Sequence, residues 1–125
     1  MLTPPFTESA LQAACHTWFH NSHPALRGLG FMIHNDGHKN PIAASLDTAR
    51  GLVPGIPDWC LMVPRQATER PYSFTHGLFV EFKVGKGRVS PIQAQRHEQL
   101  RTQGYQVEVV YELAHFQQLI AEYLA

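Results

Sequence analysis

Three charged side chains stand in or beside apolar segments of this chain. Asp58 comes directly before the apolar run 59–63, and Glu81 and Lys83 are set into a second apolar run, 78–84. Because side chains alternate between the two faces of a strand, Glu81 and Lys83 would share a face, about 6–7 Å apart. A buried charge is costly unless it is paired or bound to a metal. The pattern indicates either an ion pair within the strand or one site that uses all three charges.

The chemistry that suits this set is phosphodiester hydrolysis. Carboxylate oxygens such as those of Asp58 and Glu81 are the ligands that Mg²⁺ prefers, and we expect Mn²⁺ to substitute for it. Lys83 would position or help to deprotonate an attacking water and would neutralise charge that develops on phosphorus. We therefore predict a magnesium site in which Lys83 is catalytic.

Glu8 is a further candidate acid for this site. On a helical wheel it falls within about 20° of Cys15 and Phe19, which places it on the stripe that we expect to be buried. The alternative is a first-turn acid that interacts favourably with the helix dipole. In the first case the helix would point a carboxylate towards the site.

The apolar periodicity and the turn residues predict eight elements in one domain, residues 1–125. A helix capped by Thr7 should end near "HNSHP" at 20–24, where Pro24 cannot continue it. The other predicted elements are a strand at 30–34, a helix at 41–49, strands at 59–63 and 78–84 joined by a polar loop at 64–77, a helix from Ser90 or Pro91 to about Gln103, a strand at 105–111, and a closing helix that buries residues from Leu113 to Leu124. This order predicts an α/β fold with a central sheet flanked by helices.

Composition and cysteine usage restrict the class of protein. Apolar residues make up 44% of the chain and charged residues 16%, which is typical of a globular protein. No apolar run approaches the about 18 residues needed to span a bilayer, and the N-terminus does not resemble a signal peptide. Cys15 and Cys60 lie in apolar segments and should be buried and reduced. We therefore expect no membrane contact and a cytoplasmic location, in a bacterial or phage-infected cell.

The formal net charge is zero, but the charge is unevenly distributed. Residues 83–101 carry five basic residues against one acidic residue, a net charge of +4, whereas residues 102–125 carry −3. We expect Lys86, Arg88 and Arg96 in the basic stretch to contact DNA phosphates, although a solvated helix face would look the same. "GKG" at 85–87 lacks the other residues of a P-loop, so no nucleotide cofactor is expected.

Three segments together carry a family resemblance. "PGIPD" (54–58) before an apolar strand, then "VEFK" (80–83) and "RVSPIQAQRHEQLRTQGYQVEVV" (88–110), resemble the VRR-NUC nucleases. These belong to the PD-(D/E)xK superfamily, which has the restriction-endonuclease-like fold. The resemblance covers most of the chain, which is therefore similar to a minimal stand-alone member.

The resemblance implies a role for several positions of this sequence. It makes Asp58 and Glu81 the metal-binding acids, Lys83 the catalytic lysine, and the main-chain carbonyl of Phe82 a further metal ligand. Glu8 matches an acid of the first helix in this family.

Gln93 has two interpretations. It matches a glutamine that accompanies the active site in the family. It is also the N3 residue of a capping box, "SPIQ", with Ser90 at N-cap and Pro91 at N1. Both roles are compatible, because a helix N-terminus that faces the site would also present backbone N–H groups to phosphate.

The resemblance implies a metal-dependent DNA endonuclease that acts on branched DNA, such as four-way (Holliday) junctions, as a homodimer. A dimer also follows from symmetry, because two symmetric cuts need two active sites and this chain has room for one. The alternatives are a non-catalytic DNA-binding or assembly module that keeps the fold, and a nuclease that acts on RNA or single strands. The set of Asp58, Glu81 and Lys83 favours the catalytic interpretation.

Overall fold

The computed structural model describes residues 7–34, 40–66 and 74–125. Helices and strands follow in the order α1 (Glu8–Ser22), the short 3-10 helix η1 (Pro24–Leu26), β1 (Gly30–Met32), α2 (Pro41–Ala49), β2 (Trp59–Leu61), β3 (Arg65–Gln66), β4 (Phe74–Thr75), β5 (Leu78–Phe82), α3 (Pro91–Thr102), β6 (Gln106–Val110) and α4 (Leu113–Tyr123). The predicted α/β fold with a mixed central sheet is confirmed.

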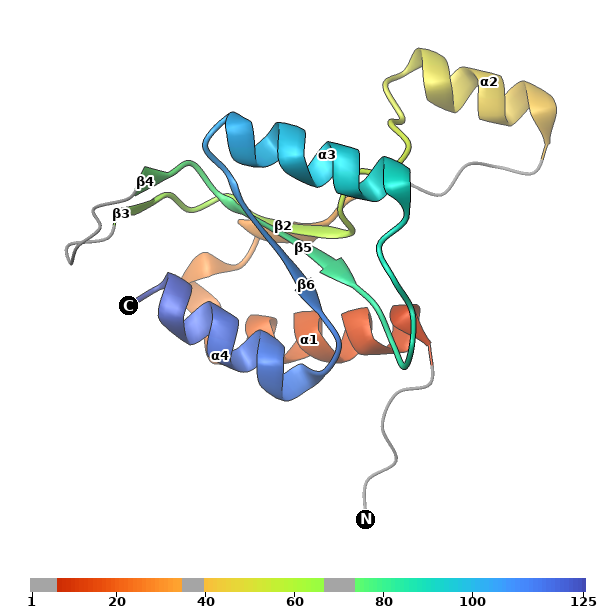
Figure 1. The fold of residues 1–125 in the computed structure, drawn as a ribbon. Coiled ribbons are helices and arrows are strands. Elements are labelled where there is room, and N and C mark those ends of the chain that lie inside the picture. The colour runs from red at the N-terminus through yellow and green to blue at the C-terminus, as the bar shows by residue number, and fades with distance from the viewer. Residues whose placement is uncertain (1–6, 35–39, 67–73) are drawn as a thin grey trace.

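The central sheet has four strands in the order β1-β2-β5-β6. The pairs β1·β2 and β2·β5 are antiparallel, whereas β5·β6 is parallel. The parallel pair requires a crossover, and α3 supplies it between β5 and β6. This connection places α3 over one face of the sheet, while α1 and α4 lie against the other (Figure 1).

The hydrophobic core lies between the sheet and the α1/α4 layer. Alternate residues of β5, namely Leu78, Val80 and Phe82, are fully buried on this side. They belong to a cluster of buried side chains from α1, the sheet and α4: Leu11, Cys15, Phe19, Trp59, Leu61, Leu78, Val80, Phe82, Val110, Phe116, Leu119, Ile120 and Tyr123. The remaining residues of β5, among them Glu81, therefore face α3.

Both predicted helix starts are confirmed by their caps. The Thr7 hydroxyl accepts a hydrogen bond from the main-chain N–H of Ala10 at 3.0 Å, which satisfies an otherwise unpaired donor of α1. At the start of α3, Ser90 is the N-cap and Pro91 the first helical residue. The helix ends before Gly104, whose φ of +92° lies in the left-handed region that favours glycine.

The polar segment between β2 and β5 was predicted as a loop, and this prediction is wrong in part. Arg65 and Gln66 pair with Thr75 and Phe74 in the two-stranded sheet β3–β4, while residues 67–73 lie outside the described part of the chain. The Tyr123 hydroxyl holds the base of this ladder, because it donates to the Val63 carbonyl at 2.6 Å and lies 3.1 Å from the Thr75 hydroxyl. Such a partner 48 residues or more away in sequence is not visible in the local composition.

Helix α2 has the predicted boundaries and is capped by Asn40. It stands apart from the layers formed by the sheet and the other helices (Figure 1), and none of its residues is buried. Within residues 7–34, 40–66 and 74–125, no helix is long and apolar enough to cross a membrane.

Candidate active site

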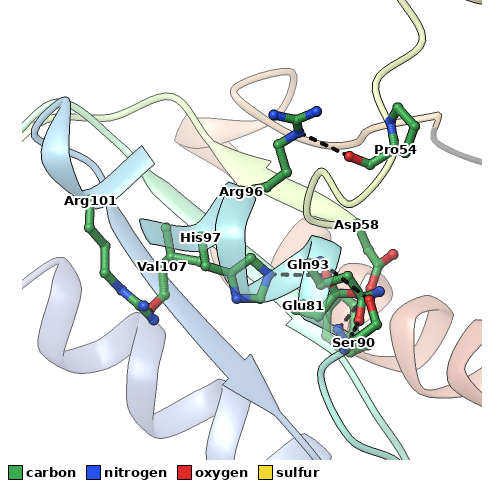
Figure 2. Close-up of polar contacts among 10 residues, drawn as sticks. Pro54, Asp58, Glu81, Ser90, Gln93, Arg96, His97, Arg101 and Val107 are labelled. Carbon is green, nitrogen blue, oxygen red and sulfur yellow. Dashed lines mark hydrogen bonds and ion pairs between the residues drawn. The ribbon is translucent and has the colours of Figure 1, made fainter. Parts of the chain in front are cut away.

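The register of β2 and β5 brings the two predicted acids together. The ladder ends with the pair Trp59 and Val80, and Asp58 lies just beyond it, beside β5. The side chain of Asp58 reaches β5, where its hydrogen bond and charge act on Glu81. Because Val80 and Phe82 face the core, Glu81 points to the opposite face, under α3 (Figure 2).

Asp58 is held by both neighbouring strands. Its main-chain N–H donates to the Val80 carbonyl at 3.1 Å, and its own carbonyl accepts from the N–H of Ile33 at 2.8 Å. The side-chain oxygen Oδ2 accepts a 2.8 Å hydrogen bond from the main-chain N–H of Phe82. The last contact fixes the direction of the Asp58 carboxylate and gives the acid before β2 a hydrogen-bonding role in the fold.

The segment that leads into Asp58 packs closely on α3. Gly55 has φ +81°, and a Cβ at this position would lie 2.7 Å from the Ile92 carbonyl oxygen. Arg96 donates from Nε to the Pro54 carbonyl at 3.0 Å (Figure 2). From Nη1 it also donates to Gln99 at 2.8 Å. Arg96, predicted to contact DNA, therefore ties the "PGIPD" segment to α3.

Glu81 is almost completely buried, with 1% of its surface exposed, and it contacts His97 of α3. The distance between His97 Nε2 and Glu81 Oε1 is 3.2 Å (Figure 2). The pKa of Glu81 is raised from 4.5 to about 9, first by burial and then by the hydrogen bond and charge of Asp58, while the charge of Lys83 lowers it to a smaller extent. Burial, followed by the charge of Arg101, lowers the pKa of His97. At neutral pH the two groups therefore form a hydrogen bond between a carboxylic acid and a neutral imidazole.

Lys83 follows Glu81 on the same face and is 8% exposed. Within the described part of the chain, Glu81 and Lys83 do not form an ion pair, since the partner of Glu81 is His97. The charge of Lys83 nevertheless lowers the pKa of Glu81, so the two groups interact electrostatically. The alternative in which Glu81 and Lys83 simply neutralise each other within the strand does not describe this geometry.

Gln93 completes the capping box that its position indicated. Its Oε1 accepts from the main-chain N–H of Ser90 at 2.9 Å, and its own N–H donates to Ser90 Oγ at 3.2 Å. This contact directs the first turn of α3, which lies above Glu81, and it occupies the amide oxygen. Any further role of Gln93 would use the amide nitrogen.

Glu8 is exposed, so its predicted burial is wrong. The helical wheel places Glu8 on the same side of α1 as the buried residues, but burial along this helix begins about one turn later, at Leu11. Glu8 and Asp58 line a cleft of about 670 Å³ between α1 and the β1–β2 edge of the sheet. The charge of Glu8 still raises the pKa of Glu81, so the three acids are electrostatically coupled.

Lys86 and Arg88 lie in the turn that follows β5, and both are exposed. Gly85, with φ +55°, allows the chain to reverse here, and the Tyr111 hydroxyl donates to the Gly87 carbonyl at 2.9 Å. The turn is therefore braced against the end of β6. It follows β5, the strand that carries Glu81, by only a few residues.

The donor set fits a divalent cation that prefers oxygen. Two carboxylates this close repel one another, and a proton on Glu81 relieves this repulsion in the protein alone. A divalent cation between Asp58 and Glu81 would relieve it more effectively, and Mg²⁺ needs only one or two carboxylates besides waters and phosphate. In the described ranges no three His, Cys, Asp or Glu side chains are close enough to bind one ion, so Glu8 does not complete a three-acid cage.

His97 was not recognised from the sequence. A signal was present, because Gln93, His97 and Leu100 follow the i, i+4, i+7 spacing of a packed helix face. In α3 His97 is the one buried residue.

A mixed sheet between one helix and a helix pair, with two acids and a lysine at one end of neighbouring strands, defines a restriction-endonuclease-like nuclease domain. The VRR-NUC domain model matches residues 7–112, and the chain belongs to this family. A solved structure described as a VRR_NUC domain protein has a TM-score of 0.76 and 22% identity, and covers 98% of this chain and 90% of its own. A second, described as a VRR_NUC domain, has a TM-score of 0.50 and 20% identity, with coverage of 89% and 95%. A search of curated proteins found no match.

Proposed function

We propose that this protein is a Mg²⁺-dependent endodeoxyribonuclease that hydrolyses phosphodiester bonds in branched DNA, such as four-way junctions, as a homodimer. The nuclease family implies DNA as the substrate. The observation that supports the metal-dependent mechanism is the closeness of Asp58 to Glu81, since the Asp58 carboxylate is bound to the N–H of Phe82 and its hydrogen bond and charge act on Glu81, with Lys83 two residues further along the chain.

Asp58 and Glu81 would hold the cation, together with the main-chain carbonyl of Phe82. When bound, Mg²⁺ would polarise the phosphate and stabilise the charge of the transition state. Asp58 is already oriented for this by the N–H of Phe82, so little side-chain rearrangement is needed. Glu81 must lose its proton, so that binding of the cation and deprotonation are coupled.

Lys83 would act on the reacting atoms. Its side chain shares the face of Glu81 and would orient the attacking water and stabilise the negative charge on the phosphate oxygens. A water would add to phosphorus and give up one proton to solvent, the P–O bond to one sugar would break, and the departing oxygen would take a proton from solvent. The products are a 5′- or 3′-phosphate and a free hydroxyl on the other side.

Lys86, Arg88 and the first turn of α3 would bind the DNA backbone on either side of the cut. Exposed cations and the free N–H groups of a helix N-terminus contact phosphate without reading sequence. The same contacts serve any DNA with the appropriate shape. Selection of branched DNA would then depend on how the two subunits present their sites.

A substrate panel tests this proposal. Labelled duplex, flap and four-way-junction DNA, together with single-stranded DNA and RNA, are incubated with and without Mg²⁺, with the Asp58→Ala protein as the control. We expect Mg²⁺-dependent cleavage of the junction by the wild type alone. Tight junction binding without cleavage would instead identify a DNA-binding module, and cleavage of RNA or single strands would change the substrate class.

A further inference from the structure

The residue that contacts Glu81 from α3 is polar, which is unusual for the most buried position of a helix that covers a sheet. His97 is 2% exposed, and no other residue of α3 is buried. A buried polar side chain is more informative than a buried apolar one, because it needs a hydrogen-bond partner. The partner is Glu81 Oε1, at 3.2 Å from His97 Nε2.

The contact engages Oε1 of Glu81, and the carboxyl group of Glu81 also shares a hydrogen bond with Asp58. We place the cation between these two acids, where it would replace the shared proton. A carboxylate on a flexible side chain binds a cation well only when its rotation is restricted, and hydrogen bonds from a surrounding residue commonly provide the restriction. In this site Asp58 is restricted by the Phe82 N–H, and His97 is the corresponding residue for Glu81.

The position of His97 is itself well determined. The capping box of Ser90 and Gln93 directs the first turn of α3, and Arg96, beside His97, ties this helix to the segment that carries Asp58. The helix therefore contacts both acids: Asp58 indirectly, through Arg96 and the Pro54 carbonyl, and Glu81 directly, through the His97 imidazole.

We propose that His97 is a positioning residue, whose Nε2–H holds the Glu81 carboxylate in the orientation that binds a divalent cation together with Asp58. This inference rests on the proposed metal site, but it concerns cation affinity and not the choice of DNA. An imidazole that donates from Nε2 cannot itself ligate the cation through that atom, so its effect is exerted through Glu81.

Three substitutions of His97 test whether it acts as a hydrogen-bond donor to Glu81 or only fills the space under α3. His97→Gln keeps an amide N–H at about the reach of Nε2, whereas His97→Asn carries the same amide on a shorter side chain that cannot reach Oε1. His97→Leu fills the space without a donor. Asn and Gln form the matched pair, because both place an amide under α3 and differ only in reach.

The primary readout is Mn²⁺ affinity of the full chain without DNA, measured by electron paramagnetic resonance of free Mn²⁺. The second readout is the Mn²⁺ concentration that gives half-maximal cleavage. We expect the Mn²⁺ affinity of His97→Asn and His97→Leu to fall about 10- to 100-fold. The affinity of His97→Gln should stay within about threefold of wild type. Saturating Mn²⁺ should restore most of the cleavage rate of the Asn protein, as expected for a residue that does not touch the reacting atoms.

The inference is overturned if the Asn protein binds Mn²⁺ as tightly as the wild type, or if Gln and Asn lose affinity equally. If His97→Leu does not fold, the comparison of His97→Asn with His97→Gln still tests the inference. The proposed function fails separately: a wild type that binds Mn²⁺ through Asp58 and Glu81 but cleaves no nucleic acid would exclude the nuclease while leaving the role of His97 in place.

Discussion

The Glu81 carboxyl group makes the candidate site sensitive to protons. It is buried, Asp58 acts on it by a hydrogen bond and by charge, and its contact with His97 links two groups that are both neutral at pH 7. Such a pair costs less to bury than two charges, which explains how a site of acids is tolerated inside a small protein. The same arrangement leaves the acid ready to exchange its proton for a cation.

The first prediction concerns the pH dependence of stability without metal. The pKa of Glu81 is raised from 4.5 to about 9, so the folded protein keeps a proton that the unfolded chain loses above pH 4.5. The stability from this group is fully present below pH 4.5 and is lost as pH rises through about 9, at no more than about 1.4 kcal/mol per pH unit. Between pH 6.5 and 9.5 in a chelator, the melting temperature of the wild type should fall more steeply than that of Glu81→Gln. Parallel curves would show that Glu81 is ionised throughout.

The second prediction concerns Lys83. Lys83→Ala should lower the cleavage rate about 100-fold or more, because the lysine acts on the attacking water and on the phosphoryl charge. Affinity for Mn²⁺ and for DNA should change little, since Asp58 and Glu81 still hold the ion. If the lysine were only a partner for Glu81, the variant would lose several kcal/mol of stability and its folded fraction would cleave at the wild-type rate. Cleavage rate, DNA affinity and melting temperature on this one variant decide between the two.

At this scale the apolar runs beside Asp58 and around Glu81 and Lys83 indicated three charges that the structure places close together, and their catalytic role stays a prediction. The contact of His97 was not predicted, and the predicted burial of Glu8 was wrong. His97 has the spacing of a packed helix face, but α3 is largely polar and the partner Glu81 is 16 residues away in sequence. A helical wheel gives the direction of Glu8 but not the turn at which packing begins.

Helix α3 is the element that assembles the site. It follows β5, and its His97 contacts Glu81. Its Ile92 and Arg96 contact Gly55 and Pro54, in the segment before Asp58. The distance between the two acids therefore depends on how closely this segment approaches the helix. Substitutions that separate them should weaken the site without touching an acid.

Gly55→Ala tests this dependence, with Gly51→Ala as the matched control. Both glycines have positive φ, +81° and +105°, so both alanines are strained, but only at Gly55 would the Cβ meet the Ile92 carbonyl, at 2.7 Å. We expect Gly55→Ala to be less stable than Gly51→Ala by about 1–3 kcal/mol in urea denaturation, the usual cost of overpacking. The stabilisation by Mn²⁺ should shrink only in the Gly55 variant. Equal behaviour of the two proteins would contradict the coupling of this segment to the site.

The turn after β5 provides the second test at the level of elements. Replacing Lys86 and Arg88 with Ala should weaken binding to all DNAs and reduce the slope of log K against log salt by about 1.8, as expected for two lost phosphate contacts. The control Arg50→Ala removes an exposed cation beside α2 and should leave the slope unchanged. An unchanged slope in the double variant would place Lys86 and Arg88 on a solvated face outside the DNA interface.

The helices and the four strands of the central sheet were predictable because capping residues and apolar periods are local signals. Observed strands are shorter than predicted at one or both ends, since ladder partners and not side-chain hydrophobicity determine where a strand stops. The β3–β4 ladder was missed for a related reason. Its strands contain two residues each, too few for a period, and Tyr123 of α4 braces their base.

At the scale of the whole molecule, Asp58, Glu81 and Lys83 form one candidate catalytic set. Such a set would hydrolyse one phosphodiester bond per binding event. Two symmetric cuts in one junction therefore need two chains related by a twofold axis.

The last prediction tests this stoichiometry by mixing subunits. Wild-type and Lys83→Ala chains are combined in known ratios and allowed to exchange, and a plasmid that extrudes a four-way junction is the substrate. In a homodimer whose subunits each cut one strand, only dimers of two wild-type chains linearise the plasmid in one binding event. The initial rate of linear product should then fall as the square of the wild-type fraction. Mixed dimers cut one strand and release nicked circles, so nicking should persist at ratios where linearisation is nearly abolished. A linear decrease of both products, or a mass of 14.1 kDa in solution at assay concentrations, would contradict the dimer and require two independent encounters with the junction.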